Sequence, residues 1–367
     1  MIPLPSPQSN SRTGTASQSL RSVCLQDLGE VDPAAPLGKE WDRLVRSNSA
    51  SGFMQSSHWA QFKRQMGLKS HHLGLFADEQ LFGGAIFYAA PNTKGAGFLV
   101  APDGPVLPWH DSELAVHCMN VLLQALETDA PALESMAVRI APRLPPELPE
   151  ALQGFAKSPV GLIEHKTMYL DLSPEPADLL KKIKPKARYN IGLAKRKGVT
   201  VCEESSLSAA RKFFEVMQSV ATRNRISVEP LSYFMALLET LCPPGLAKVF
   251  FAEHDGEVLG ALLMMIFGDR ATYLYGGTTD VKRNLMGGYA LQWAAINAAK
   301  DAGAKIYDFW GFDARSSPEN NYAGFSRFKS QFCGESIELA GALDFYFMDC
   351  LADVVIKAIN EITILSE

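Results

Sequence analysis

The stretch Val249-Phe-Phe-Ala-Glu-His-Asp-Gly-Glu-Val-Leu-Gly-Ala261 indicates the fold, because it holds two apolar strands joined by a tight polar turn. A second stretch, Leu73-Gly-Leu-Phe-Ala-Asp-Glu-Gln-Leu-Phe-Gly-Gly-Ala85, has nearly the same pattern. Each predicted hairpin lies at the same place in its half of the chain. Hairpins share composition, so one match alone is weak. The equal placement favours two copies of one domain.

Further elements follow the same order around both hairpins. In the first half, apolar periodicity predicts helices at 37–46, 59–66 and 111–128, and strands at 72–77, 81–89, 95–100 and 136–140. In the second half it predicts strands at 167–172, 248–253, 258–267, 272–276 and 305–310, and helices at 176–184, 188–198, 207–223 and 289–302. In strand 272–276, Tyr273 and Tyr275 alternate with Leu274, which predicts both phenols on one face of the sheet.

Helices, a hairpin, another strand, a glycine-bearing turn into a helix and a final strand form the order of an acetyltransferase-like (GNAT) fold. The sequence therefore predicts an α/β (α+β) protein with two such domains in tandem, each a mixed central sheet flanked by helices. The predicted boundaries are a disordered tail at 1–20, a first domain at 21–165 and a second at 166–339.

Composition limits the class of protein. The chain has 367 residues with a net charge of −5, which does not indicate a general nucleic-acid binder, so any such site must be a local patch. No apolar run reaches the roughly 18 to 20 residues that span a bilayer. The Ser- and Pro-rich start has no apolar central stretch, which predicts a disordered tail and not a secretory signal. Six scattered cysteines without a CxxC pair predict isolated, mostly buried thiols in a reducing cytoplasm, and no metal site.

The segment from Lys181 to Gly198 is the most unusual, because it has eight basic residues and no acidic one. Such a cluster favours phosphate-rich partners, with Lys186 and Arg188 as the leading contacts and Tyr189 beside them for base stacking. The alternative is a solvated helix face.

A second phosphate candidate is the turn from Arg283 to Gly288. Backbone N–H groups at a helix start attract anions, Gly287 and Gly288 allow close approach, and Arg283 adds a cation. A plain tight turn is the alternative.

Two further segments carry candidate lysines. Arg327-Phe328-Lys329 follows a polar, glycine-rich loop, and Lys329 is placed to hold a phosphate or stabilise an oxyanion, unless it is an ordinary surface lysine. In Gln55-Ser-Ser-His-Trp-Ala-Gln-Phe-Lys63, Trp59 and Phe62 are predicted to face the core and Lys63 to point away from it.

At these segments the sequence resembles the Fem aminoacyltransferases, which build peptidoglycan interpeptide bridges from aminoacyl-tRNA. The resemblance runs from about Phe53 to Asp344 and is strongest in four motifs: Lys186-Ala-Arg-Tyr-Asn-Ile-Gly-Leu-Ala-Lys-Arg-Lys-Gly-Val, Tyr273-Leu-Tyr-Gly-Gly-Thr-Thr, Tyr307-Asp-Phe-Trp-Gly and Arg327-Phe-Lys-Ser-Gln-Phe-Cys-Gly. It implies that the segment 340–367 returns to complete the first domain. With no insertion between Gly198 and Ser206, the chain resembles the type without a coiled-coil arm.

The resemblance also implies residue roles. Lys63 matches a lysine that binds the precursor's diphosphate, and Tyr233 and Tyr275 match tyrosines that contact the precursor. Lys329 matches the lysine at the aminoacyl-tRNA end, a candidate for transition-state stabilisation, with Phe328 and Arg327 beside it in the substrate site. Two positions depart from the family pattern: Glu229 stands where an arginine is expected, and Leu107-Pro108 where an acidic residue is expected, with Asp111 as the nearest substitute.

The implied function is transfer of an amino acid from aminoacyl-tRNA to an amine of a nucleotide- or lipid-linked muropeptide, in cell-wall biogenesis and maintenance of cell shape. The implied enzyme is a cytoplasmic monomer with peripheral contact to the membrane surface, and it needs no cofactor beyond aminoacyl-tRNA as co-substrate. One alternative is an acetyl-CoA-dependent N-acetyltransferase that uses the Arg283–Gly288 turn. Another is a non-catalytic protein that binds RNA or the cell envelope.

Overall fold

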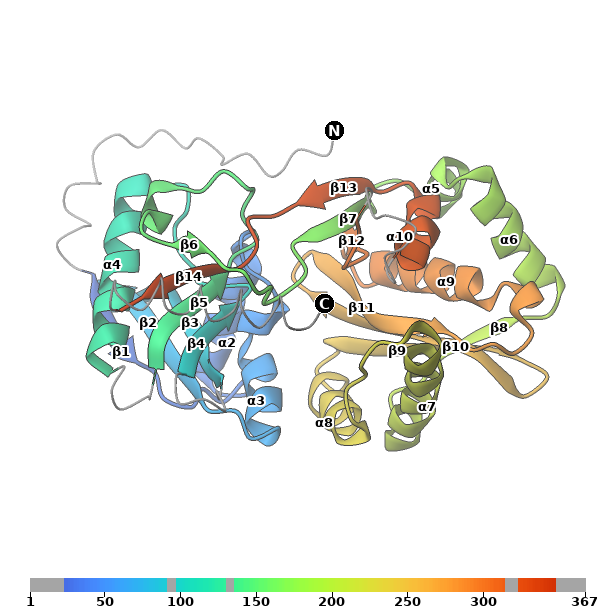
Figure 1. The fold of residues 1–367 in the computed structure, drawn as a ribbon, viewed down its shortest axis with the longest axis horizontal. Coiled ribbons are helices and arrows are strands. Elements are labelled where there is room, and N and C mark those ends of the chain that lie inside the picture. The colour runs from blue at the N-terminus through green and yellow to red at the C-terminus, as the bar shows by residue number, and fades with distance from the viewer. Residues whose placement is uncertain (1–22, 91–96, 130–134, 314–322, 348–367) are drawn as a thin grey trace, which may run out of the picture. The chain divides into compact units, whose positions relative to one another are not determined.

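The computed structural model describes residues 23–90, 97–129, 135–313 and 323–347 (Figure 1). Contacts divide these residues into two compact units. The first unit contains the described residues up to His165 together with those from Glu338, and the second contains Lys166–Ile337. The predicted tail and the part of the predicted return segment beyond residue 347 lie outside the described residues. No helix in the described part of the chain is both long and apolar enough to cross a membrane.

The first unit is built on one seven-stranded sheet with the order β1-β2-β3-β4-β5-β14-β6. The strands are β1 (Cys24–Asp27), β2 (Ser70–Ala77), β3 (Gln80–Ala90), β4 (Gly97–Pro102), β5 (Ser135–Ala141), β6 (Ala156–Lys157) and β14 (Leu343–Tyr346). The helices are α2 (Pro36–Ser47), α3 (Ser57–Gln65) and α4 (Ser112–Asp129), with short 3-10 turns η1 (Phe53–Gln55) and η2 (Glu150–Leu152).

The second unit has its own seven-stranded sheet with the order β13-β7-β12-β11-β10-β9-β8. The strands are β7 (Lys166–Asp171), β8 (Thr200–Glu203), β9 (Ala247–His254), β10 (Glu257–Phe267), β11 (Arg270–Thr278), β12 (Ile306–Asp308) and β13 (Glu335–Glu338). The helices are α5 (Pro176–Lys182), α6 (Pro185–Arg196), α7 (Leu207–Asn224), α8 (Leu231–Leu241), α9 (Gly287–Asp301) and α10 (Ala323–Lys329), with 3-10 turns η3 (Arg283–Leu285) and η4 (Ser330–Phe332). Strand β8 occupies the stretch between α6 and α7.

The two sheets have the same pattern of strand pairing. Both predicted hairpins form, as β2–β3 and β9–β10. In each sheet the second hairpin strand pairs antiparallel with a third, which pairs parallel with a fourth: β3–β4–β5 in one and β10–β11–β12 in the other. The fourth strand then pairs antiparallel with β14 in the first unit and with β7 in the second. The shared pattern supports the duplicated domain indicated by the two hairpins.

Helices cover both faces of the second sheet (Figure 1). On one face, α9 buries Leu291, Ala295 and Ile296 against a core that contains Leu262 and Met264 of β10. On the other face lie α7 and α8, whose rings Phe213 and Phe234 meet with centroids 5.2 Å apart. One face of the sheet therefore packs against α9, and the other packs against α7 and α8.

A β-bulge separates the two tyrosines of β11, so the prediction that they share a face is wrong. Leu263 of β10 pairs with Tyr275, and the next residue, Met264, pairs with Tyr273. Leu274 is therefore an extra residue, which interrupts the alternation of side chains. Tyr273 packs against the core beneath α9, whereas Tyr275 contacts Tyr233 of α8.

The cysteine prediction was also partly wrong. Among the described residues, Cys118 is buried, Cys202 and Cys242 are intermediate, and Cys24 and Cys333 are exposed. All five are free thiols. Burial raises the pKa of the Cys118 thiol to about 12, so this side chain acts as a small apolar group in the core.

His72 of β2 makes the first unit sensitive to acid. The ring is buried, and burial lowers the pKa of the imidazole to about 4, with a smaller effect from the nearby Arg64 charge. The unfolded chain binds a proton near pH 6.5, so it holds more protons than the folded chain between about pH 6.5 and 4. Stability should therefore fall by about 3 kcal/mol as the pH drops through this window.

Urea unfolding of the parent and of His72→Leu at pH 7 and pH 4.5 measures this effect. The variant should lose much of the difference between the two pH values, and His110→Gln, which removes an exposed histidine, should keep it. Equal pH dependence in the parent and His72→Leu would contradict the assignment.

Candidate active site

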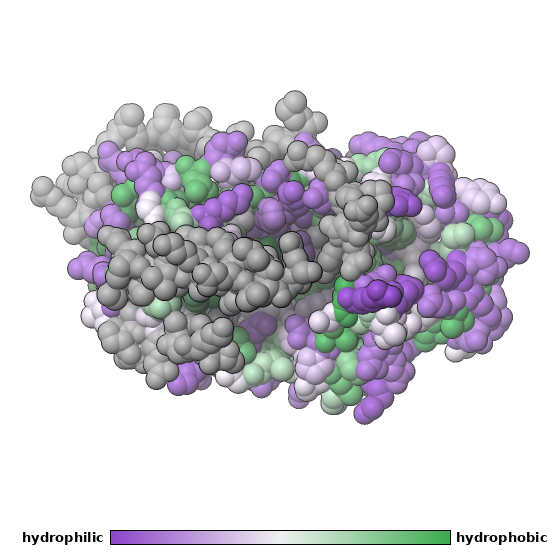
Figure 2. All heavy atoms as spheres, viewed as in Figure 1, coloured by the Kyte–Doolittle hydropathy of each residue, from purple (hydrophilic) through white to green (hydrophobic). Residues whose placement is uncertain are grey.

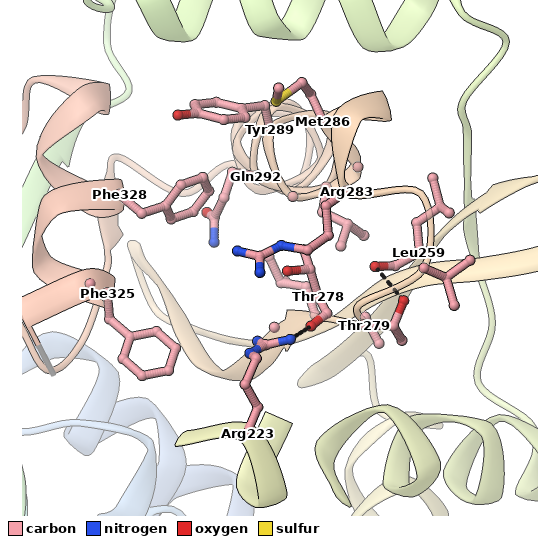
Figure 3. A pocket seen from close by; sticks show the side chains of 18 of the residues that line it. Arg223, Leu259, Thr278, Thr279, Arg283, Met286, Tyr289, Gln292, Phe325 and Phe328 are labelled. Carbon is pink, nitrogen blue, oxygen red and sulfur yellow. Dashed lines mark hydrogen bonds between the residues drawn. The ribbon is translucent and has the colours of Figure 1, made fainter. Parts of the chain in front are cut away.

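A cavity of about 350 Å³ opens in the second unit between β11, α9 and α10 (Figure 3). Aromatic side chains form much of its wall, and polar groups reach into it from several elements. The aromatic residues are Tyr273, Tyr289, Phe325 and Phe328, and the polar ones include Arg223, Thr278, Arg283 and Gln292. An apolar cavity with a few converging polar groups is the usual form of a small-ligand site.

The cavity exists because two parallel strands separate. Strand β12 pairs with β11 only along Arg270–Thr272 and ends at Asp308, whereas β11 continues to Thr278. The cavity wall takes Tyr273, Gly277 and Thr278 from the part of β11 beyond this pairing. Helix α10 contributes Phe325 and Phe328 to the opposite wall (Figure 3).

Acidic partners balance the cations at this cavity. The Arg223 guanidinium donates to the carbonyl oxygen of Thr278 at 2.8 Å and to Asp280 Oδ1 at 3.0 Å. Arg283 lies 3.7 Å from the same carboxylate oxygen, and Lys282 pairs with Glu257 at 2.5 Å. Asp280 thus holds both arginines beside the cavity.

Gly287 and Gly288, the glycines of the predicted helix-start phosphate site, both line the cavity at the start of α9. A Cβ on Gly287 would lie 2.9 Å from Cβ of Leu259, and one on Gly288 would lie 3.0 Å from Cγ2 of Thr278. The missing side chains therefore let the helix start approach β10 and β11 closely. This packing role needs no ligand.

Lys329 is buried, with 8% of its surface exposed, so the alternative of an ordinary surface lysine is wrong. The ammonium donates to the carbonyl oxygens of Trp310 and, at 2.8 Å, Gly311. It also lies 5.4 Å from the ring centroid of Tyr273, within the range of a cation–π interaction. Trp310 has a φ of +50°, which is unusual for a residue other than glycine. The backbone bends at this residue, just after β12 ends, and the carbonyl oxygens of Trp310 and Gly311 bind the Lys329 ammonium.

Of the two residues that precede Lys329 in the chain, one lines the cavity and the other is exposed. Phe328 lines the cavity and stacks edge-on with Tyr289 at 5.0 Å between ring centroids. Arg327 is exposed, and its carbonyl oxygen accepts a hydrogen bond from Ser330 Oγ at 2.9 Å. The structure therefore places Phe328 in the cavity wall, Lys329 against Tyr273 of that wall, and Arg327 at the surface.

Tyr233 and Tyr275 form a separate pair on the α8 face of the sheet. The hydroxyl oxygens are 3.2 Å apart and the rings meet edge-on at 6.2 Å. Burial raises the pKa of Tyr233, with further increases from Tyr275 and the Glu229 carboxylate. Burial also raises the pKa of Tyr275, and Glu229 adds to this increase. The exposed Glu229 is thus close enough to act on both phenols.

The predicted basic segment forms the end of α5 and all of α6, and the surface over these helices is mostly hydrophilic (Figure 2). Lys186 is exposed, whereas Arg188 donates to the carbonyl oxygen of Lys181 at 2.8 Å, which ties α6 to the end of α5. Tyr189 is 60% exposed, and the cation over its ring is Arg196, at 5.7 Å, rather than the neighbouring Arg188.

Two other candidates lie in the first unit. The Lys63 ammonium is 5.2 Å from the Trp59 ring centroid and 5.3 Å from that of Phe62, so the side chain lies along its own helix instead of pointing clear of the core. Asp111 accepts the backbone N–H of Leu114 at 3.1 Å, the bond of a residue that caps α4.

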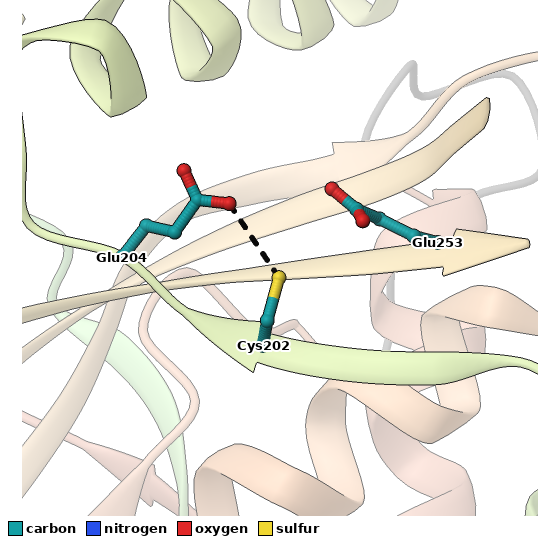
Figure 4. Close-up of side chains that lie close together, drawn as sticks. All are labelled: Cys202, Glu204 and Glu253. Carbon is teal, nitrogen blue, oxygen red and sulfur yellow. Dashed lines mark hydrogen bonds between the residues drawn. The ribbon is translucent and has the colours of Figure 1, made fainter. Parts of the chain in front are cut away.

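Cys202, Glu204 and Glu253 form a cluster of possible metal ligands in the second unit (Figure 4). The Lys212 ammonium donates to both carboxylates, at 2.7 Å to Glu204. Burial raises the pKa of the Cys202 thiol, with Glu253 as a second cause, and this opposes the thiolate that a metal needs. The Lys212 ammonium therefore supplies the positive charge that a metal ion would bring to Glu204 and Glu253.

Three residues of this region were not among the predicted site residues. Gln292 is buried in α9, Tyr307 in β12, and Phe325 lies in α10. A buried amide in an otherwise apolar helix face was the one signal for Gln292 in the sequence. The other two are aromatic residues that the sequence does not distinguish from core.

Related proteins share this architecture. The sequence matches the FemAB family over residues 37–150, 151–255 and 244–355. A lipid II:glycine glycyltransferase of Staphylococcus aureus (strain MRSA252) is 21% identical, over 84% of this chain and 91% of that protein. The lipid II:glycine glycyltransferase of Staphylococcus saprophyticus subsp. saprophyticus is 20% identical, over 83% and 90%.

Solved structures match as well. FemX superposes with a TM-score of 0.78 at 19% identity, covering 87% of this chain and 98% of FemX. A tandem GNAT protein from the clavulanic acid biosynthesis pathway gives a TM-score of 0.57 at 12% identity, covering 89% and 99%. The predicted fold of two GNAT-like domains with mixed sheets is confirmed.

Proposed function

The chain belongs to the FemAB family, and from this premise we propose that it transfers an amino acid from aminoacyl-tRNA to an amine of a peptidoglycan precursor peptide. The observation that carries the proposal is the buried Lys329 ammonium, held over the ring of Tyr273, a residue that lines the cavity. Relatives named lipid II:glycine glycyltransferase support acyl transfer to a wall precursor.

The chemistry asks little of the protein. A neutral amine attacks the aminoacyl ester, the C–N amide bond forms and the ester C–O bond breaks. The amine loses a proton and the released ribose oxygen gains one. Holding both substrates in register supplies much of the acceleration. The remaining demand is the negative charge on the tetrahedral intermediate, which a fixed ammonium such as Lys329 stabilises in a water-poor site.

For the donor, we propose the cavity of the second unit as the site of the acylated end of tRNA. Aromatic walls suit a nucleoside base, and Arg223 and Arg283 suit phosphate. A phosphate here must compete with Asp280, which already holds both guanidinium groups. The exposed cations of α5 and α6, with Lys186 and Arg188 among them, are proposed to contact more distant tRNA phosphates.

For the acceptor, we propose a muropeptide precursor that contacts Tyr233 and Tyr275 of the second unit. The Glu229 carboxylate, which raises the pKa of both phenols, disfavours an anionic group at that position, because like charges repel. The acceptor's diphosphate is therefore proposed to bind away from the Tyr233–Tyr275 pair.

The experiment that tests the function is mass spectrometry of precursor peptides after incubation with the purified protein and a pool of charged tRNA. A mass increase equal to one amino-acid residue, dependent on intact charged tRNA, is expected. Acetylation from acetyl-CoA would instead favour an N-acetyltransferase, and binding of RNA without any transfer would favour a non-catalytic protein.

The salt dependence of tRNA binding tests the role of the basic helices. Each protein–phosphate ion pair adds about 0.7 to 0.9 to the slope of log K against log salt, through counterion release. If Lys186 and Arg188 each bind a phosphate, replacing both by glutamine should lower the slope by about 0.7 to 0.9 for each of them. Lys248→Gln, which removes a lysine paired with Glu203 at 2.9 Å, is the matched control and should leave the slope unchanged. An unaltered slope in the double variant would make α5 and α6 a solvated surface only.

A further inference from the structure

Asp308, the last residue of β12, is a fully buried carboxylate that the proposed chemistry does not use. Its Oδ1 accepts a hydrogen bond from the hydroxyl of Thr167 of β7 at 2.5 Å, and another from the backbone N–H of Trp310 at 2.9 Å. Thr167 is also fully buried. Because a buried carboxylate is costly unless hydrogen bonds satisfy it, these bonds hold Asp308 in one place.

The bond from Trp310 to Asp308 accompanies the bend of the chain just after β12. An aspartate that accepts the backbone N–H two residues further on forms an Asx turn. Trp310 and Gly311 then have φ values of +50° and +46°, in the left-handed region. A tryptophan rarely adopts this conformation, because its Cβ comes too close to the backbone, so other contacts must hold it there. Asp308 supplies one such contact, and Thr167 fixes Asp308.

The bent segment presents two carbonyl oxygens to Lys329. The ammonium donates to the carbonyl oxygen of Trp310 and, at 2.8 Å, to that of Gly311. Trp310 therefore donates its N–H to Asp308 and accepts a hydrogen bond from Lys329 at its carbonyl oxygen. A single residue thus links the buried carboxylate to the buried ammonium.

Direct proton transfer by Asp308 does not fit this geometry. The described residues that line the cavity do not include Asp308, and the residue is 0% exposed. A general base must reach the proton that it removes, either directly or through one water molecule. Asp308 therefore acts on a reaction in the cavity only through its neighbours.

We propose that Asp308 and Thr167 are positioning residues for Lys329. Asp308 fixes Trp310, and the carbonyl oxygens of Trp310 and Gly311 then fix the ammonium where negative charge develops on the acyl donor. The inference rests on the proposed acyl-transfer function, and it holds for either carrier of the acyl group. No bond to Asp308 forms or breaks during the reaction.

Asp308→Ala and Asp308→Asn, each made in the parent and in Lys329→Met, test the role of the carboxylate. Asp308→Ala should lower kcat about 10- to 100-fold with the KM for the acceptor nearly unchanged, because a small displacement of a reacting group is enough for such a loss. Asp308→Asn should stay within about 3-fold of the parent, since asparagine keeps an oxygen that accepts the Trp310 N–H. In Lys329→Met, Asp308→Ala should cause no further loss, because no ammonium is left to position.

Thr167→Val and Thr167→Ser test the same role without removing the carboxylate, so they decide it even if Asp308→Ala does not fold. Valine has the shape of threonine without the hydroxyl and should lower kcat about 3- to 10-fold, the usual loss for one hydrogen bond. Serine keeps the hydroxyl and should retain the parent rate. Asp171→Ala is the matched control, because Asp171 at the end of β7 also accepts the N–H two residues on, from Ser173 at 2.8 Å, but lies outside the cavity lining. It should leave kcat unchanged.

Three results would overturn the positioning role. They are an equal fall in kcat from Asp308→Ala in the parent and in Lys329→Met, a loss in Asp308→Asn as large as that in Asp308→Ala, and a normal rate in Thr167→Val. The assay uses whichever acyl donor the parent protein accepts, charged tRNA or acetyl-CoA. Use of acetyl-CoA alone would overturn the proposed tRNA donor, while the same variants would still decide the positioning role. No acyl transfer from either donor would overturn both.

Discussion

Replacing Lys329 by methionine is expected to lower kcat for aminoacyl transfer by about 10²- to 10³-fold, the usual loss when one donor to a developing oxyanion is removed. Methionine keeps the length and the apolar stem of the side chain, but it has no ammonium to face the intermediate. Binding of the muropeptide precursor should survive, because the role assigned to Lys329 is confined to the transition state. Single-turnover measurements with charged tRNA, together with calorimetry of the precursor, separate the two quantities.

Lys300→Met is the matched control for this variant. The Lys300 ammonium also donates to backbone carbonyl oxygens, those of Leu172 at 3.0 Å and Ser173 at 3.4 Å, in the same unit but outside the cavity lining. It should lose stability without losing turnover. Lys329→Arg should fail to restore activity, since a planar guanidinium is larger than the ammonium that the buried carbonyl oxygens of Trp310 and Gly311 bind. Near-normal kcat for Lys329→Met would remove this lysine from the chemistry.

Much of the fold could be predicted from the sequence, because its strongest signals are local. The hairpin strands alternate or run apolar on both sides of short polar turns, and β2–β3 and β9–β10 form where these patterns place them. The helix predicted at 289–302 is observed as α9 (Gly287–Asp301), since apolar residues repeat along one face. Propensity and burial agree at these elements, so sequence alone suffices.

Other elements were missed because they depend on distant partners. Helix α8 (Leu231–Leu241) was not predicted, although Phe234 and Leu237 are fully buried against the sheet. Strand β12 is shorter than the strand predicted at 305–310, because Trp310 and Gly311 bend away with positive φ values. Short edge strands such as β1 and β13 have little periodicity to detect and form by pairing with longer neighbours.

In the candidate site, too, the local features could be predicted from the sequence, whereas the contacts between distant segments could not. The motif around Lys329 pointed to a functional lysine, yet its burial and its contact with Tyr273 arise only when α10 meets the end of β12. The strand period placed Tyr273 and Tyr275 on one face, and the bulge at Leu274 reversed one of them. A single inserted residue has this effect because side chains alternate with a period of two. Gln292 and Tyr307 meet across the core from α9 and β12, a relationship that no spacing in the sequence contains.

The second large effect concerns β14, the strand from the far end of the chain that lies between β5 and the edge strand β6 in the first sheet. Strand β14 (Leu343–Tyr346) pairs with β5, and Asp344 accepts two hydrogen bonds from Arg139, at 2.6 Å from Nε and 2.8 Å from Nη2. The Asp344 side chain is 1% exposed and that of Arg139 12%. Arg139 also lies over the Phe98 ring, 4.7 Å from its centroid, so the guanidinium is fixed on a second side.

Asp344→Ala should therefore destabilise the first unit by about 3 to 5 kcal/mol, because it leaves the Arg139 charge buried without its partner. Replacing both residues by apolar ones, as Arg139→Met with Asp344→Leu, should recover most of the loss, since the penalty comes from the unpaired charge and less from the missing attraction. Asp178→Ala, which breaks the exposed pair between Asp178 and Lys181, should have no measurable effect. Urea unfolding, with hydrogen exchange to assign the change to β5 and β14, measures all three. If Asp344→Ala unfolds at the same urea concentration as the parent, this ion pair does not hold β14 in the sheet, and the backbone pairing of β14 with β5 and β6 must hold the strand by itself.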